Sequence, residues 1–163
     1  MDVIIMPLTT SLLKSLKNKY PQFSFKKGDD FSWSSSNNTI FYDNTADDFS
    51  ILLVHELSHA LLGHELYESD IQLIIIERQA WDYAVKLASS FDIEISDETI
   101  QLNLDTYRDW LHKRSTCPAC QATGLQSQNV YKCLACNHQW QANQARKCNL
   151  RRYKTETKQK TYE

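Results

Sequence analysis

Hydrophobic residues recur every three or four positions in four segments of this chain, which is the spacing that places side chains on one face of an α-helix. The first segment ends before Pro21, because proline cannot continue a helix. Polar residues that favour helix starts open the other three, as Thr45 with Asp48, Ser69 with Gln72, and Ser96. The pattern predicts helices over about residues 8–19, 45–63, 69–90 and 96–114.

The segment between the first two predicted helices has a different pattern. Residues 22–43 alternate and are rich in aromatic residues, which favours β-strands. Residues typical of turns, around Gly28 and from Ser34 to Asn38, divide the segment. We expect two or three short strands, of which the last is Thr39–Tyr42. The predicted fold class is therefore α+β, with a small helical domain and a short β-sheet.

Composition narrows the class of protein. The chain has 163 residues with only three glycines and three prolines, which favours helices over an all-β fold. No apolar run approaches the ~20 residues that a membrane span needs, and the start lacks the features of a signal peptide. The sequence predicts a cytoplasmic protein with no membrane partner. In that compartment its five cysteines favour metal binding over disulfides.

A histidine-rich motif lies in the second predicted helix, where residues 54–65 read VHELSHALLGHE. On a helix, His55 and His59 project from one face one turn apart, so both rings can reach one zinc ion. Glu56 lies beside them and can take a proton from a water whose pKa the zinc lowers. The alternative is an ordinary helix end, but two imidazoles on a largely buried helix are costly unless they are satisfied. We therefore favour the metal site.

Catalytic zinc sites have three protein ligands, so a third must come from downstream. His64 would point about 140° away from His59 if the helix continued, and we interpret it as a residue facing the helix C-terminus. We interpret Glu65 and Glu68 as solvated. The neighbours of Glu77 at helical spacing are apolar, so its carboxylate is predicted to be buried, where it must pair with a base or bind metal. Glu77 is the expected third ligand.

The stretches HELSHALLGH and ERQAWDYA resemble the ImmA/IrrE family of zinc metallopeptidases over about residues 39–90. That family shows HExxH followed by a helix with a Glu-x-x-Ala pattern, here Glu77 to Ala80. The resemblance implies a gluzincin-type site, with His55, His59 and Glu77 on a catalytic zinc and Glu56 as the general base. Known members cleave DNA-bound regulators or act in phage, mobile-element or stress responses. The asparagine common after that alanine is Trp81 here.

A second metal motif lies near the end of the chain. Two CxxC pairs separated by twelve residues predict a closed, tetrahedral structural zinc site formed by Cys117, Cys120, Cys133 and Cys136. Two pairs of free thiols would leave residues 117–140 with almost no core, so the metal must supply the folding energy. The stretch YKCLACNHQW resembles zinc ribbons of transcription-associated proteins. The sequence therefore predicts two zinc ions per chain, one catalytic and one structural.

Three further residues belong to the predicted ribbon. Tyr131 and Trp140 are expected to pack over it. His138 is a competing ligand in principle, although four cysteines suffice. Cys148 is interpreted as an unpaired thiol.

Charge divides the chain unevenly. Residues 1–114 carry 10 Lys and Arg against 18 Asp and Glu, a net of −8, and residues 115–163 carry 8 against 2, a net of +6. We predict a zincin-like metallopeptidase domain at 1–114, a zinc ribbon at 115–145 and a basic, flexible tail at 146–163. The tail favours a polyanion, with a merely solubilising tail as the alternative. The candidate nucleic-acid-binding residues are Arg146, Lys147, Arg151, Arg152 and Lys154.

The leading prediction is a zinc-dependent endopeptidase acting on protein or peptide substrates, including DNA-associated or regulatory proteins. Strand Thr39–Tyr42 would bind an extended substrate by edge pairing. The candidates for stabilising the oxyanion are Tyr67, Tyr83 and His64.

Two alternatives remain open. One is a protease of DNA–protein crosslinks similar to SprT-like proteases, whose third zinc ligand is a downstream histidine. Here only His64, His112 and His138 are available. The other is a non-catalytic regulator that binds nucleic acid or protein on a metallopeptidase fold.

Overall fold

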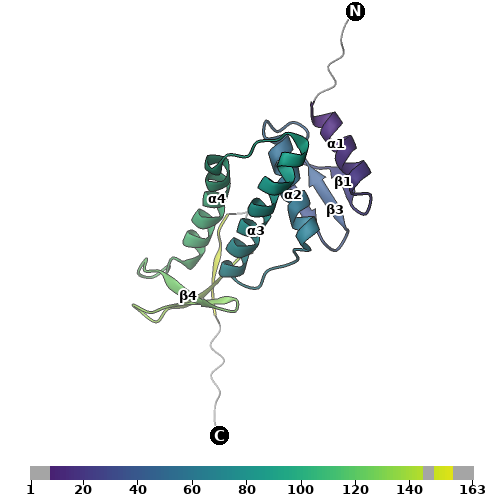
Figure 1. Cartoon of the computed structure of the whole chain (residues 1–163). Coiled ribbons are helices and arrows are strands. Elements are labelled where there is room, and N and C mark those ends of the chain that lie inside the picture. The colour runs from purple at the N-terminus through teal and green to yellow at the C-terminus, as the bar shows by residue number, and fades with distance from the viewer. Residues whose placement is uncertain (1–7, 145–148, 156–163) are drawn as a thin grey trace, which may run out of the picture. The chain divides into compact units, whose positions relative to one another are not determined.

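The computed structural model describes residues 8–144 and 149–155 and has the α+β architecture that the sequence predicts (Figure 1). Its α-helices are α1 (Leu8–Lys19), α2 (Phe49–Leu62), α3 (Asp70–Ala88) and α4 (Asp97–Ser115). A 3-10 turn, Ser89–Phe91, follows α3. These elements match the four helices expected from hydrophobic periodicity. Within the described ranges, no helix is sufficiently long and apolar to cross a membrane.

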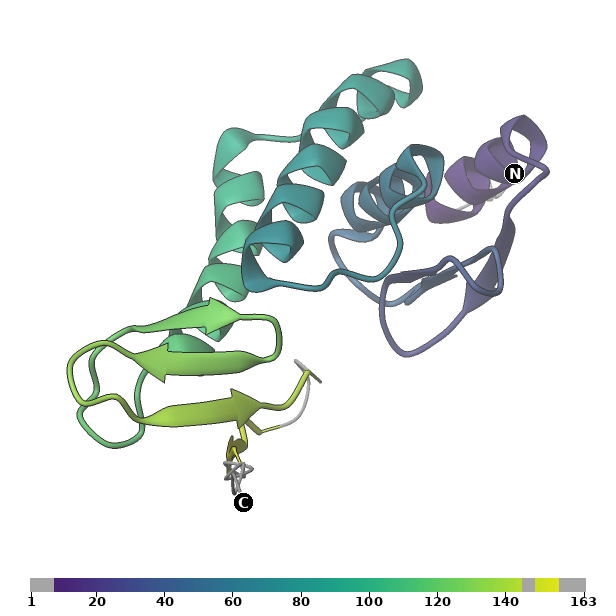
Figure 2. The same ribbon diagram turned by 90° about the horizontal axis from the view of Figure 1, so that it is seen from below.

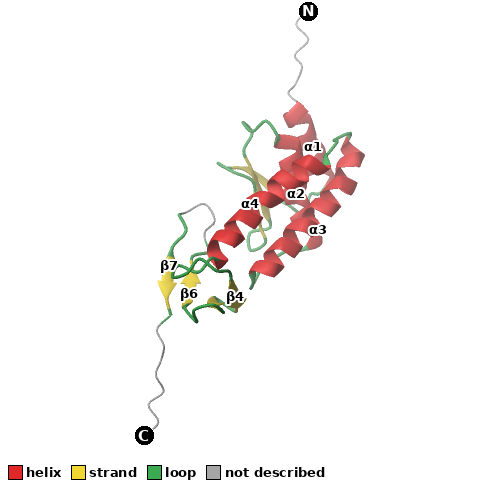
Figure 3. Ribbon diagram, turned by 90° about the vertical axis from the view of Figure 1, so that its left-hand side faces the viewer, coloured by secondary structure: helices red, strands yellow, loops and turns green. Residues whose placement is uncertain are grey.

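The chain forms two compact units. One contains the described residues up to Leu66 together with Ile75–Gln101, and the other contains Tyr67–Ile74 together with the described residues from Leu102 onward. Helices α3 and α4 each contribute residues to both units. The ribbon therefore shares its unit with the second part of α4 and the beginning of α3. Figure 3 distinguishes the helices, in red, from the strands, in yellow.

The first unit contains a three-stranded sheet of β1 (Ser24–Lys27), β2 (Ser32–Ser34) and β3 (Thr39–Tyr42), in the order β1-β3-β2. Strand β3 is central, because it pairs in parallel with β1 and antiparallel with β2. The prediction that Thr39–Tyr42 offers an edge to a substrate is therefore wrong, and β2 is an edge strand instead. Helix α2 packs on β2 and β3 and buries Leu53, Val54 and Leu57.

The ends of the helices follow the predicted signals in part. Ser69 and Ser96 accept hydrogen bonds from the backbone N–H groups of Gln72 and Thr99, at 3.3 and 3.1 Å, as expected of helix starts. The capping box predicted from Thr45 is wrong, because the Thr45 hydroxyl donates instead to Asp43 at 2.6 Å. The N-cap residue of α2, Asp48, makes no side-chain capping bond.

The second unit contains the ribbon, an antiparallel sheet in the order β4-β5-β6-β7 (Figure 2). Its strands are β4 (Gly124–Ser127), β5 (Val130–Cys133), β6 (Gln139–Ala142) and β7 (Arg152–Lys154). Part of the segment expected to be a flexible tail is therefore strand β7, because its backbone pairs with that of β6.

The core of the ribbon is small and contains the two aromatic residues expected to pack there. Tyr131 and Trp140 stack with their ring centroids 5.5 Å apart, and both are about 1% exposed. Gly124 lies so close that a Cβ atom added there would come within 2.3 Å of the Trp140 ring. Glycine at this position is thus a packing requirement of Trp140.

A buried arginine completes the second unit. Arg114 is 1% exposed and donates to the Tyr131 hydroxyl at 3.0 Å. It also lies 3.6 Å from the carboxylate of Asp70, which accepts a hydrogen bond from Tyr131. The Trp140 indole N–H donates to the backbone carbonyl of Arg114 at 2.9 Å. Helix α4, the start of α3 and the ribbon sheet are therefore joined by one charged, hydrogen-bonded cluster.

Candidate metal centres

The first candidate centre forms where one face of α2 meets α3. His55 and His59 lie one turn apart on α2, and Glu77 comes from α3. Their exposed fractions are 4%, 7% and 6%, so all three side chains are buried. The helix pattern accounts for the placement of Glu77, since Leu73, Ala80 and Trp81, at helical spacing from it, are buried apolar residues. The structure thus brings together the three side chains that the sequence selects.

The three donor atoms form a nearly regular triangle. The two histidine Nε2 atoms are 3.1 Å apart, and Oε2 of Glu77 lies 3.2 Å from that of His55 and 3.6 Å from that of His59. Zinc ligands at bond lengths of about 2.0–2.2 Å would form a tetrahedron with edges of about 3.3–3.6 Å. The donor set and its spacing therefore fit one tetrahedral metal ion with a position left for another ligand.

Electrostatics hold Glu77 in its charged form. Burial raises the pKa of Glu77, but hydrogen bonds with His55 and His59 outweigh this effect and lower it to about 2. Burial has the opposite effect on His59 and lowers its pKa, but the hydrogen bond and the charge of Glu77 outweigh burial, so the net shift of this pKa is upward. Two imidazoles and a carboxylate form a donor set that is found in catalytic zinc sites.

Aromatic and histidine side chains contact the two candidate ligands on α2. The ring of Trp81 stacks on His55, with centroids 4.0 Å apart. Nδ1 of His59 lies 2.9 Å from Nδ1 of His64, so the two rings share a hydrogen bond. Such a partner fixes which nitrogen of a ligating histidine is available to a metal.

The position of His64 differs from the expectation that it faces the helix end. Gly63 adopts a left-handed conformation with φ of 66°, and its N–H and that of His64 bond to the carbonyls of Ala60 and His59. The chain therefore reverses after Leu62 instead of continuing as a helix, which returns His64 to His59. The glycine was the signal in the sequence that could have predicted this contact.

Glu56, the predicted general base, is half-buried beside this centre. Burial raises the pKa of Glu56. The nearby His55 and His59 and a hydrogen bond from the backbone N–H of Trp33 partly offset this increase. Trp33 belongs to the edge strand β2, and its indole N–H donates to the backbone carbonyl of His64 at 2.9 Å. The edge strand therefore contacts both the candidate base and the residue that supports His59.

A hollow of about 380 Å³ adjoins His64 and is lined also by Leu62, Gln79, Asp82, Tyr83 and Lys86. Two of the three candidates for oxyanion stabilisation, His64 and Tyr83, thus line one hollow. Tyr67 belongs to the second unit. Glu65 and Glu68 are exposed, in agreement with their interpretation as solvated residues.

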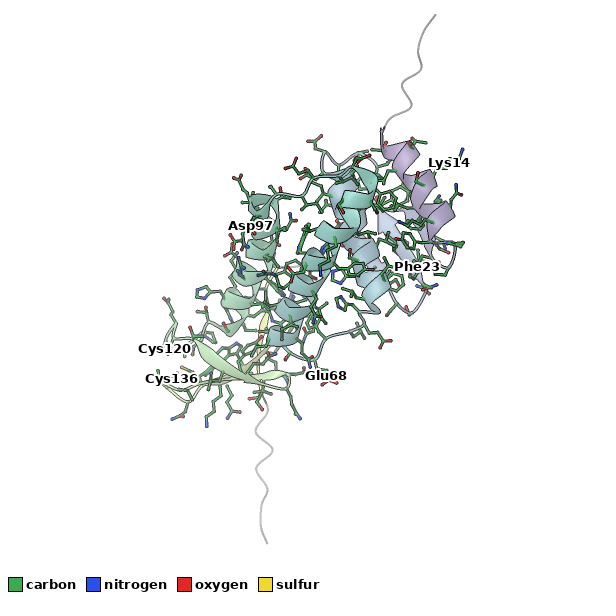
Figure 4. The ribbon with its side chains drawn as sticks, in the orientation of Figure 1. Lys14, Phe23, Glu68, Asp97, Cys120 and Cys136 are labelled. Atoms are coloured by element: carbon green, nitrogen blue, oxygen red, sulfur yellow. The ribbon has the colours of Figure 1, made fainter. Side chains whose placement is uncertain are left out.

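The second candidate centre is the group of four cysteines, in which Cys120 and Cys136 lie at the exposed tips (Figure 4). The Sγ atoms of Cys117 and Cys136 are 3.7 Å apart, and those of Cys120 and Cys133 are 3.4 Å apart. Zinc–sulfur bonds of about 2.3 Å correspond to a tetrahedron edge of about 3.8 Å. The cysteine group therefore fits a closed, four-coordinate ion.

The two CxxC loops are structurally equivalent. In each, the first cysteine donates its N–H to the carbonyl five residues on, at 2.8 Å from Cys117 to Ala122 and 2.9 Å from Cys133 to His138. Gln121 and Asn137 then follow in left-handed conformations. Backbone N–H groups of Cys136 and Ala135 help to lower the pKa of Cys133 to about 7, which favours the thiolate that a metal requires.

The other predicted residues that the structure describes belong to the second unit. Arg151, Arg152 and Lys154 are exposed, the last two on β7. Arg146, Lys147 and Cys148 lie outside the described residues. His138 is half-buried, 6.1 Å from Trp140 between ring centroids, and is not part of the cysteine group.

No protein-family model, curated protein or solved structure matches this chain. The two candidate metal centres therefore rest on the residues and geometry described above.

Proposed function

We propose that the chain is a zinc-dependent peptidase whose catalytic ion is bound by His55, His59 and Glu77. The observation that carries this proposal is the buried triangle of three donor atoms, whose sides of 3.1, 3.2 and 3.6 Å suit zinc. Its three protein ligands leave one position of a tetrahedron open, which distinguishes a catalytic site from a structural one. The four cysteines would bind a second, structural zinc ion.

Glu56 is suited to move the proton in peptide hydrolysis. When bound, zinc supplies a Lewis acid that polarises the peptide carbonyl and makes water acidic at neutral pH. The Glu56 carboxylate takes the proton of the attacking water and returns it to the leaving amine nitrogen. Its raised pKa, caused by burial, brings this group closer to the pH at which such a shuttle operates.

Edge strand β2 is the proposed substrate-binding strand in place of β3. An extended peptide that pairs with β2 would pass beside Glu56 and His64, because Trp33 contacts both. Tyr83 and His64 are the remaining candidates for stabilising the developing oxyanion. We propose protein substrates of a regulatory, DNA-associated kind, in line with the basic ribbon and with the resemblance to ImmA/IrrE peptidases.

The first alternative, a protease similar to the SprT-like class, requires a histidine as the third ligand. In the candidate metal group of this chain the third residue is Glu77, and neither His112 nor His138 is part of that group. A non-catalytic regulator on the same fold would bind zinc equally well but would not hydrolyse peptides. Activity is therefore the property that separates this second alternative from the proposal.

The test uses two glutamate variants of the full chain. Glu56→Gln should retain two zinc ions per chain and lose peptidase activity on an unfolded protein substrate, because it removes a base and no ligand. Glu77→Ala should retain only about one zinc ion. Glu65→Ala, which alters an exposed residue, is the control for both measurements. Full turnover by Glu56→Gln, or two zinc ions in Glu77→Ala, would contradict these assignments.

A further inference from the structure

A hollow of about 250 Å³ lies on the ribbon between its first CxxC loop and strand β7. Pro118 and Ala119 of the loop, His138, and Arg152, Tyr153 and Lys154 of β7 line it. Most of this lining is apolar, while the two cations of β7 lie along it. The hollow is lined entirely by residues of the second unit.

Aromatic rings and cations are combined in this hollow. Tyr153 is 49% exposed, so about half of this residue is accessible to a ligand. The guanidinium of Arg152 is held at one end, because its Nη2 donates to the backbone carbonyl of Lys113 at 2.6 Å. This bond uses one of the five N–H donors of an arginine. A flat apolar ligand with negative charges at its edge would complement these groups.

The charge of the surrounding ribbon also favours a negatively charged ligand. Between Ser115 and Thr155 the sequence has no aspartate or glutamate, whereas it has six lysines and arginines. An acidic peptide would satisfy these cations, but it would leave the exposed ring and the apolar lining unused. Nucleic acid offers both a chain of phosphates and a base for each of them.

We propose that this hollow binds single-stranded nucleic acid, with one base on Tyr153 and His138 and adjacent phosphates on Arg152 and Lys154. A single strand is required because its bases present their faces to a protein ring, whereas a duplex keeps them stacked. The contact is insensitive to sequence, since every base has such a face. This inference does not depend on peptidase activity.

The experiment is fluorescence anisotropy of the full-length, zinc-loaded protein with labelled DNA and RNA oligonucleotides of about twelve nucleotides. Each is measured as a single strand and as a duplex, between about 50 and 200 mM salt. We expect single strands to bind more tightly than duplexes. A comparison of the DNA strand with the RNA strand shows which of the two nucleic acids the hollow prefers.

Variants of β7 locate the contact. Tyr153→Ala should weaken single-strand binding roughly 5- to 150-fold, whereas Tyr153→Phe, which keeps the ring, should retain it. Lys154→Gln should weaken binding and reduce the slope of log affinity against log salt by about 0.7. Lys132→Gln is the matched control, because it removes the same charge from an exposed position of β5 outside the hollow.

Zinc content and thermal unfolding show that each variant keeps its fold. Equal or tighter binding of duplexes would overturn the proposal, as would unchanged affinity in Tyr153→Ala. Equal losses in Lys132→Gln and Lys154→Gln would show diffuse attraction by a basic segment and would also overturn it. Absence of binding at tens of micromolar protein in low salt would assign the ribbon to protein docking instead.

Discussion

The two candidate metal centres are positioned in opposite ways. His55, His59 and Glu77 project from two helices that also contribute buried residues to the hydrophobic core, and the three side chains hydrogen-bond to one another. The four cysteines lie on two short loops. Among the residues that the structure describes, the buried cluster beside them consists of Tyr131 and Trp140 with two of the cysteines, and Ala122 and Ala142 pack against it. We therefore expect the scaffold of the first centre to fold without metal, and the second centre to be part of its own scaffold.

Metal removal should give the largest effect and tests this contrast directly. A strong chelator should unfold the ribbon, because a structural zinc contributes on the order of 10 kcal/mol to folding. The first unit should remain folded, since its core residues are buried by other apolar side chains. Hydrogen exchange followed by mass spectrometry is the measurement. Loss of amide protection in β5 with retention in α2 is expected, and simultaneous loss in both would contradict the comparison.

A smaller effect should come from the charged cluster around Arg114 in the second unit. Arg114→Met should destabilise that unit by about 3–5 kcal/mol, because Asp70 loses the buried cation that compensates its charge. Denaturant unfolding of the zinc-loaded protein is the measurement. Arg108→Met on the same helix is the control, because its ion pair with Asp105 is exposed and is worth about 1 kcal/mol or less. Equal costs would remove Arg114 from the cluster that joins α3, α4 and the ribbon.

The smallest effect concerns the support of one ligand. His64→Ala should weaken metal binding at the first centre by about 10- to 100-fold, because His59 loses the partner of its Nδ1 atom. Binding at the cysteine centre should not change. Zinc competition titrations measure both. His138→Ala serves as the control, since only the backbone of His138 bonds to a cysteine. A similar loss in both variants would show that histidine removal acts non-specifically.

Local patterns were sufficient for much of the fold. The helices follow from periodicity, and Glu77 was selected because apolar neighbours at helical spacing predict a buried carboxylate. The cysteine group follows from loop spacing alone, since each CxxC is closed by its own backbone hydrogen bonds. These features depend on residues within a few positions of one another.

The features that sequence reasoning missed depend on contacts between distant residues or on competition between local ones. The alternation of residues predicts strands but not their order in the sheet. The sequence therefore could not show that β3 is central and that β2 is an edge strand. Thr45 was expected to cap α2, but Asp43 competes for its hydroxyl. In the sequence Arg114 is the last charged residue of a predicted amphipathic helix, and its burial depends on contacts with the ribbon that follows and with Asp70 of α3.

At Gly63 the backbone is left-handed, but the surrounding space is open, so the effect of handedness can be distinguished there from the effect of packing. A Cβ atom added there meets no atom within 4 Å, in contrast to Gly124, where it would collide with Trp140. The cost of a side chain at position 63 is therefore one of chirality: an L-alanine opposes the positive φ, whereas a D-alanine introduced by chemical synthesis favours it. The same turn returns His64 to His59. Proteins with L-alanine and with D-alanine at position 63 would therefore have the same composition but a different geometry around His59, a candidate metal ligand.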